Sequence, residues 1–136
     1  LYSKDYLLNR LATLTGGRVA EEVICHTCTT GASNDIEKAT QMARSMITIY
    51  GMSDKYGMMA LETRGNSYLG GGSQLACSDE TAADIDSEAR EMIAAAKKKA
   101  TEIITANIDK MHKSAQYLLE KETITGEEFM KIFKGD

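Results

Sequence analysis

Proline and tryptophan are both absent from this chain of 136 residues, and phenylalanine occurs only twice. Alanine, methionine, lysine and glutamate are plentiful instead. This set of residues favours helices and disfavours an extensive sheet. The length suits one domain with a hydrophobic core of its own. The composition therefore predicts a mostly α fold, with residues 1–136 forming a single helical domain.

Other absences limit the possible functions. No apolar run approaches the roughly 20 residues of a membrane-spanning helix, and no signal-peptide pattern opens the chain. The net charge is −4 and no basic stripe carries interleaved aromatic residues, which argues against nucleic acid as a partner. The three cysteines, Cys25, Cys28 and Cys77, are too few and too irregular for a disulfide scaffold, so we expect a reducing, cytosolic setting. The chain begins at Leu1 and not at methionine, so we expect either a processed product or a piece of a longer protein.

The segment Thr29–Tyr50 predicts a polar turn followed by an amphipathic helix. Asn34 is the expected N-cap, with Ser33 as the alternative, and Glu37 would complete a capping box. Asp35 lies in the first turn but on the side that leans toward the core. Its carboxylate either complements free N–H groups and the helix dipole, or acts as a metal ligand or acid–base group. Spacing alone favours the first explanation. The predicted buried face consists of Ile36, Ala39, Ala43, Met46, Ile47 and Tyr50.

Two regions flank this helix. Residues 4–24 are predicted to be helical, although Gly16–Gly17 mark either a break or a place where another backbone comes close. After the central helix, which should stop at Gly51, the segment 58–61 is expected to form at most one short strand.

The C-terminal half predicts a helical pair. Ser78 or Asp79 caps a long helix whose apolar stripe is rich in alanine, and small residues allow close approach of a second helix. Beyond a break near Asn107, a following helix is expected to pack antiparallel on the long one. A last short helix should start at Thr125 and bury its apolar residues, Phe129, Ile132 and Phe133.

Two features with possible chemistry have simpler explanations. Cys25 and Cys28 form a C-x-x-C pair, but a zinc ribbon needs a second ligand pair and a thioredoxin-like role needs a βαβ context. We therefore interpret them as incidental loop cysteines. His112 is an isolated histidine and is not assigned a function. No catalytic or cofactor-binding residue is assigned in this chain.

Several motifs taken in order resemble the protease domain of FtsH-type proteases, which are membrane-anchored, ATP-dependent zinc metalloproteases of the AAA-plus class. The resemblance covers nearly the whole chain and implies the C-terminal part of the peptidase domain. The motifs are G-G-R-V-A-E-E (Gly16–Glu22), T-T-G-A-S-N-D-I (Thr29–Ile36), A-R-S-M (Ala43–Met46), Y-G-M-S-D-K-Y-G (Tyr50–Gly57) and S-D-E-T (Ser78–Thr81).

The resemblance also implies a role for Asp35. In such proteases two histidines of an H-E-x-x-H helix and a distant aspartate hold zinc, and the match places that aspartate at Asp35. Three protein ligands leave one position for water; the metal lowers its pKa and the glutamate of the motif accepts its proton. Glu21 and Glu22 either orient a zinc-bound histidine or serve a surface or helix-pairing role, and we assign neither.

The chain departs from the family pattern because it has no H-E-x-x-H motif: its only histidines are His26 and His112. The ATPase module, with its ATP and magnesium, and the membrane segments are also absent. The resemblance implies a parent protein at the cell inner membrane, with its protease domain in the cytoplasm, that forms a homo-hexamer and degrades unfolded or membrane proteins. The fragment would be soluble, contact the membrane only through the absent segments, and be inactive alone.

A different class of function stays open. A degenerate relative would keep this scaffold as a non-catalytic helical oligomerisation module without metal chemistry. The coding sequence upstream of Leu1 distinguishes the two, because only the protease requires a histidine pair around a glutamate there.

Overall fold

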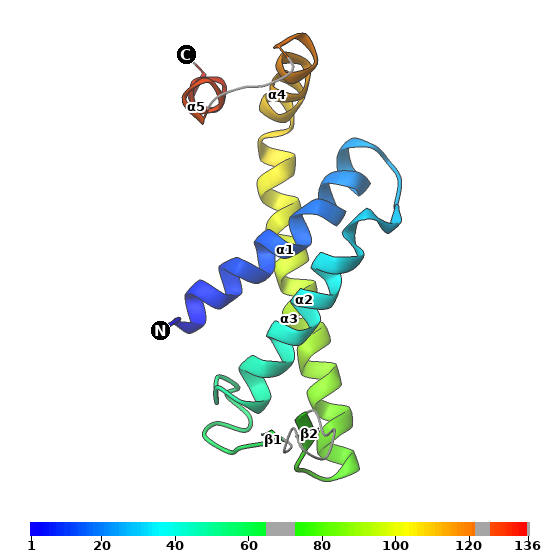
Figure 1. Cartoon of the computed structure of the whole chain (residues 1–136), viewed down its shortest axis with the longest axis vertical. Helices are drawn as coiled ribbons and strands as arrows, with labels where there is room; N and C mark the ends of the chain where they lie inside the picture. Colours follow the sequence, from blue (N-terminus) through cyan, green and yellow to red (C-terminus); the bar gives the residue numbers. More distant parts are fainter. Residues whose placement is uncertain (65–72, 122–125, 136) are drawn as a thin grey trace.

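Five helices and one small hairpin make up the computed structural model, which describes residues 1–64, 73–121 and 126–135. The mostly α fold predicted from the composition is confirmed. The elements, in order, are α1 (Lys4–Ile24), a 3-10 turn (Thr30–Ala32), α2 (Ser33–Thr48), β1 (Glu62–Arg64), β2 (Ser73–Leu75), α3 (Asp79–Ala106), α4 (Ile108–Lys121) and α5 (Gly126–Lys134) (Figure 1).

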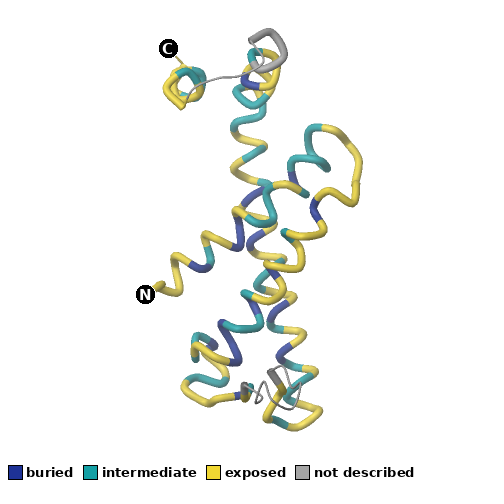
Figure 2. The backbone as a smooth tube through the Cα atoms, viewed as in Figure 1, coloured by how far each residue is buried: buried dark blue, intermediate teal, exposed yellow. Residues whose placement is uncertain are grey.

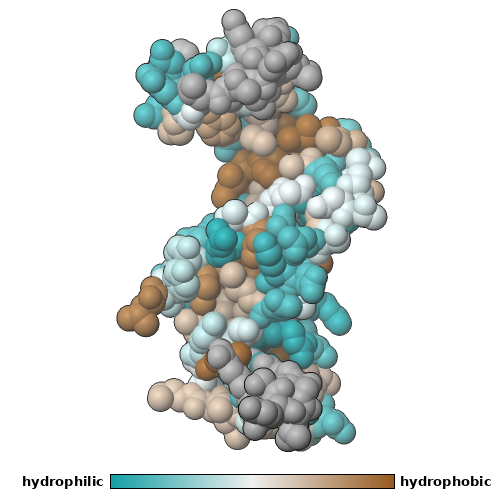
Figure 3. Space-filling model, in the orientation of Figure 1, coloured by the Kyte–Doolittle hydropathy of each residue, from teal (hydrophilic) through white to brown (hydrophobic). Residues whose placement is uncertain are grey.

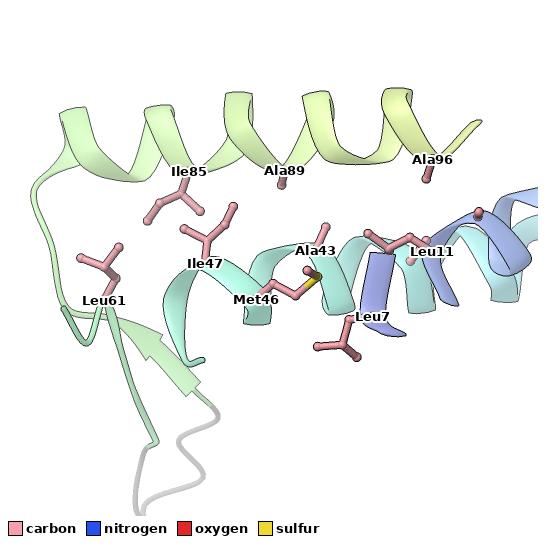
Figure 4. Close-up of a cluster of buried hydrophobic side chains, with 11 residues drawn as sticks. Leu7, Leu11, Ala43, Met46, Ile47, Leu61, Ile85, Ala89 and Ala96 are labelled. Atoms are coloured by element: carbon pink, nitrogen blue, oxygen red, sulfur yellow. The ribbon is translucent and has the colours of Figure 1, made fainter. Parts of the chain in front are cut away.

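The core lies where α1 and α2 pack against α3. α1 and α2 form a hairpin whose arms diverge from the connecting loop and cross α3 (Figure 1). The buried positions of all three helices concentrate around this crossing (Figure 2). Alanines on α3 allow the two other helices to approach closely, and the larger side chains fill the space between them (Figure 4). The cluster includes Leu7 and Leu11 of α1, Ala39, Ala43, Met46 and Ile47 of α2, Leu61, and Ile85, Ala89 and Ala96 of α3.

α1 runs without a break through its two adjacent glycines. It starts at the N-cap Ser3, whose hydroxyl accepts the Tyr6 N–H at 3.1 Å. Two glycines cost a helix interior about 2 kcal/mol relative to alanine. Leu11 and Val19 on either side are completely buried, and burying such a side chain contributes about 1.5–3 kcal/mol. Tertiary packing therefore offsets the glycine cost, and neither predicted explanation of the glycines holds. The helix does not break, and among the described residues no backbone atom of another segment lies within 4 Å of a Cβ built at Gly16 or Gly17.

α2 begins differently from the prediction. The 3-10 turn runs directly into the helix, so that Ala32 is the N-cap and contributes no side-chain bond. The predicted capping box of Asn34 and Glu37 is therefore wrong. Most of the predicted buried face is confirmed, but Ile36 is 45% exposed and Tyr50 is 54% exposed. The reason is position, since Ile36 lies in the first turn and Tyr50 lies beyond the end of the helix.

The short strand lies later than predicted and has a partner. β1 pairs with β2 in an antiparallel hairpin, with Glu62 opposite Leu75, whereas the predicted segment 58–61 is not a strand. Leu61 is 1% exposed, and its backbone N–H donates to the Thr48 carbonyl at 3.1 Å. This contact attaches the base of the hairpin to the end of α2. Gly51 has a φ of +62°, the left-handed conformation expected where the helix has stopped.

The N-cap of α3 is Ser78, whose hydroxyl accepts the Thr81 N–H at 3.1 Å, so one of the two predicted caps is confirmed. Its main partners are α1 and α2, and α4 contacts it only sparsely. The packing of α3 against the following helix is thus much less extensive than the predicted antiparallel pair requires. The single residue Asn107 separates the two helices, and helical hairpins need loops of about two to five residues. The chain therefore continues past the end of α3 (Figure 1).

α5 packs on α4 at the end of the molecule opposite the hairpin of β1 and β2 (Figure 1). The Tyr117 hydroxyl donates to the Glu128 carboxylate across this contact. The rings of Phe129 and Phe133 meet at a tilt, with 4.5 Å between their centroids, yet no residue of α5 is fully buried. Phe129 is 37% exposed, so its predicted burial is wrong, whereas Ile132 and Phe133 are partly buried. Among the described residues α4 is the main neighbour of this helix, which explains the exposure. The predicted start at Thr125 lies outside the described residues.

Among the described helices, none combines the length and the hydropathy that a bilayer-spanning segment requires.

Candidate metal centre

Asp35, the predicted metal ligand, occupies the first turn of α2 and is partly buried. Its Oδ2 lies 3.8 Å from the point that a Cβ of Gly17 would occupy. The carboxylate is thus placed beside the glycine step of α1, where no side chain intervenes. Within residues 1–64, 73–121 and 126–135 it forms no hydrogen bond and no ion pair, so it does not cap its own helix through a side-chain bond.

A groove of about 570 Å³ lies between the diverging arms of α1 and α2. α1 contributes Leu7, Arg10 and Leu14 to its lining; α2 contributes Lys38, Gln41, Met42 and Ser45; Leu1, Tyr2, Tyr50 and Met52 complete it. Residues three or four apart share a helix face. The stripe on α1 therefore continues to Gly17, and the stripe on α2 starts from Asp35. Helical spacing thus aligns the groove with the point where these two residues meet. Three of the residues that line the groove, Leu1, Tyr2 and Tyr50, are exposed, and a hydrophobic projection stands at the N-terminal end of the chain (Figure 3).

The loop before Asp35 is held by two side chains from α1. The Glu21 carboxylate accepts both the backbone N–H of Thr29, at 3.1 Å, and its hydroxyl. The Arg18 guanidinium donates to the Thr29 carbonyl at 3.1 Å. Hydrogen bonds from the hydroxyl and the N–H of Thr29, together with the charge of Arg18, hold the pKa of Glu21 below its ordinary value. Glu21 is therefore an ionised anchor for the loop.

Glu22 faces a different partner. Its carboxylate pairs with the Lys97 ammonium of α3 at 3.0 Å and accepts a weak hydrogen bond from the Cys28 thiol at 3.7 Å. The contact with Lys97 is the main reason that the pKa of Glu22 is lowered. Both glutamates that the sequence left unassigned thus have partners.

Arg18 and Thr29 were not singled out from the sequence. Arg18 and Glu21 nevertheless stand three residues apart on one face of α1, and this spacing indicates that the two side chains act together.

The other metal-ligating residue types do not gather around Asp35. Cys25 and Cys28 are free and exposed, and His26 and His112 are exposed. In the part of the chain that the structure describes, no group of three or more histidine, cysteine, aspartate or glutamate residues is arranged to hold a metal. An unpaired, partly buried carboxylate fits the requirements of one ligand. The remaining donors of a zinc site must come from another segment.

Known proteins resemble this chain over nearly its whole length. The chain matches peptidase family M41 over residues 1–132. It is 52% identical over its whole length to the ATP-dependent zinc metalloprotease FtsH of Lancefieldella parvula, covering 21% of that protein. It is 48% identical over 99% of its length to the FtsH of Clostridium perfringens, and 50% identical over 98% to the chloroplastic FTSH 1 of Arabidopsis thaliana, covering 19% of each. The chain spans about one-fifth of the length of these curated relatives.

Proposed function

Because the chain belongs to peptidase family M41, we propose that it forms the C-terminal part of the peptidase domain of a membrane-anchored, ATP-dependent zinc metalloendopeptidase. The resemblance to FtsH-type proteases that the motifs indicated is confirmed. Within that enzyme, this segment supplies the third zinc ligand, Asp35, and the helical scaffold that holds it. The segment alone is catalytically inactive.

The observation that carries the proposal is the state of the Asp35 carboxylate. It is partly buried, lies beside Gly17 and has no hydrogen bond or ion pair among the described residues. Taking a carboxylate partly out of water without a partner is unfavourable. A cation bound at this point would offset that unfavourable free energy. Because Asp35 stands in the first turn of a packed helix, its position relative to an incoming metal is fixed before the metal binds.

The groove between α1 and α2 supports the same proposal. Its lining is largely apolar, and helical spacing aligns it with Asp35. A helix with an apolar face that packed along this groove would bring its own side chains next to that carboxylate. We assign the groove to the helix that carries the H-E-x-x-H motif. When bound, zinc supplies Lewis-acid chemistry and lowers the pKa of a bound water, while Asp35 supplies negative charge and one fixed oxygen.

The rest of the proposal concerns the parent protein. Its substrates are unfolded or membrane proteins, its proteolysis is driven by ATP and magnesium in a separate ATPase module, and it works as a homo-hexamer at the inner membrane with the peptidase domain in the cytoplasm. Support comes from the similarity to FtsH-type proteases and from the names of the relatives, which describe ATP-dependent zinc metalloproteases.

The test compares two aspartates in the full-length protein. Asp35→Asn removes a metal-binding oxygen with little change of shape, and Asp109→Asn is the matched control because Asp109 also lies in a first helical turn. We expect about one zinc per wild-type chain by elemental analysis, loss of zinc and of proteolysis in Asp35→Asn with ATP hydrolysis retained, and no change in Asp109→Asn. Unchanged zinc content in Asp35→Asn would refute the assignment. Stoichiometric zinc bound to residues 1–136 alone would contradict the proposal that this segment supplies a single zinc ligand.

A further inference from the structure

All the backbone and side-chain polar groups of Thr29 take part in hydrogen bonds. Its N–H and its hydroxyl both donate to the Glu21 carboxylate, and its carbonyl accepts from the Arg18 guanidinium at 3.1 Å. The hydroxyl oxygen also accepts the Gly31 N–H at 3.2 Å. Arg18 and Glu21 stand one turn apart on α1, so a single face of that helix holds this one loop residue from both sides.

This contact controls how α2 begins. Thr29 caps the 3-10 turn Thr30–Ala32, and that turn passes directly into α2 at Ser33. The N-cap of α2, Ala32, contributes no side-chain hydrogen bond. A missing side-chain cap normally leaves a helix start free to fray. Here the bonds of Thr29 to α1 replace that cap, and Asp35 lies in the first turn of the helix that they hold.

The residues of α1 that hold Thr29 also lie next to the residue of α1 that faces the Asp35 carboxylate. Gly17, beside which Asp35 lies, immediately precedes Arg18 on α1. One stretch of α1, from Gly17 to Glu21, thus provides both the surface next to the carboxylate and the anchors of the loop that delivers it. Without the hydrogen bonds of Thr29 to Arg18 and Glu21, only the packing of the later turns of α2 would hold the Asp35 carboxylate beside α1.

From these contacts we propose that Thr29 is a positioning residue for Asp35: held by Arg18 and Glu21, it fixes the first turn of α2 so that the carboxylate stays beside Gly17, ready to bind metal. The effect of Thr29 on metal affinity rests on the proposed function. Its effect on the first turn of α2 does not depend on any metal. Thr29 itself touches neither metal nor substrate in this role.

The experiment uses three variants and two measurements. Thr29→Val keeps the shape and loses the hydroxyl, and Thr29→Ser restores the hydroxyl. Thr40→Val is the matched control, because among the described residues the Thr40 hydroxyl donates to the Ile36 carbonyl of its own helix alone, at 2.9 Å. Amide hydrogen exchange across residues 29–36 is measured in the full-length protein. The zinc dissociation constant is measured in the full-length protein by competition with a chelator, a readout separate from peptidase activity.

We expect Thr29→Val to speed exchange at Gly31 and in the first turn of α2, and to weaken zinc binding by about tenfold or more, the scale seen when a supporting contact of a metal ligand is removed. Thr29→Ser should restore both values, and Thr40→Val should change neither. Unchanged exchange in Thr29→Val overturns the proposal, and so does faster exchange with unchanged zinc affinity. Failure of the proposed function is seen separately, as wild-type protein whose zinc affinity equals that of Asp35→Asn.

Discussion

Replacing Ile85 by alanine tests whether the crossing of α2 and α3 carries the stability of this fold. Ile85 is completely buried and faces Ile47 of α2 and Leu61 at the base of the hairpin (Figure 4). The change removes three carbon groups, and about 0.8 kcal/mol for each gives a transfer loss of roughly 2.4 kcal/mol. A residual cavity of about 50 Å³ adds roughly 1.2 kcal/mol. The expected loss in the free energy of unfolding is therefore about 3.5 kcal/mol.

The matched control is Ile103→Ala, at a position on the same helix that is 53% exposed. Only part of the transfer free energy is lost there, and the better helix propensity of alanine returns about 0.4 kcal/mol, so we expect a change below about 1 kcal/mol. Urea unfolding followed by circular dichroism measures both. With an unfolding entropy of about 2.1 cal/mol/K per residue, the loss at Ile85 corresponds to a fall in Tm of about 12 °C. Equal losses in the two variants would refute the reasoning, because burial would then not distinguish the positions.

Two further predictions concern the loop after α2. Gly51→Ala should destabilise the chain more than Gly57→Ala: both glycines have positive φ, which costs alanine about 1–2 kcal/mol, but only at Gly51 would the new Cβ lie 3.0 Å from a backbone oxygen. Urea unfolding checks this, and equal losses would contradict it. Asp84→Asn should flatten the dependence of stability on pH that the contacts of Asp84 with Lys55 and Tyr56 create, which thermal unfolding from acid to alkaline pH measures.

The sign of that pH dependence follows from the shifted groups. The hydrogen bond from Lys55, and then that from Tyr56, lower the pKa of Asp84, so its stabilisation is present above its ordinary value of 3.8 and is lost as the pH falls through the lowered pKa. The bond to Asp84 raises the pKa of Lys55 and of Tyr56. Their contribution is present below the ordinary values of 10.5 and 10.0 and is lost as the pH rises through the raised ones. Wild-type pH dependence in Asp84→Asn would contradict this assignment.

The candidate site was only partly accessible to sequence reasoning. The helical spacing around Asp35 indicated a carboxylate that leans inward, and the structure places it beside Gly17. Nothing in the local spacing indicated that Glu21 would bind Thr29 across the loop. That contact depends on how the loop folds back on α1, and a hydrogen bond between residues on two segments leaves no periodic signal in either of them.

Local chemistry determined the helices of this protein, because apolar spacing, a polar residue such as Ser78 at a helix start and the absence of proline act within a few residues of one another. Only the tertiary structure decided that α1 continues through Gly16–Gly17, that α2 begins from a 3-10 turn, and that α3 packs on α1 and α2 and hardly on α4. Burial decides such outcomes, and a residue's burial depends on which distant segment covers it. For the same reason the helical spacing indicated that the Asp35 carboxylate leans inward, while the packing of the helices decided that Gly17 lies beside it.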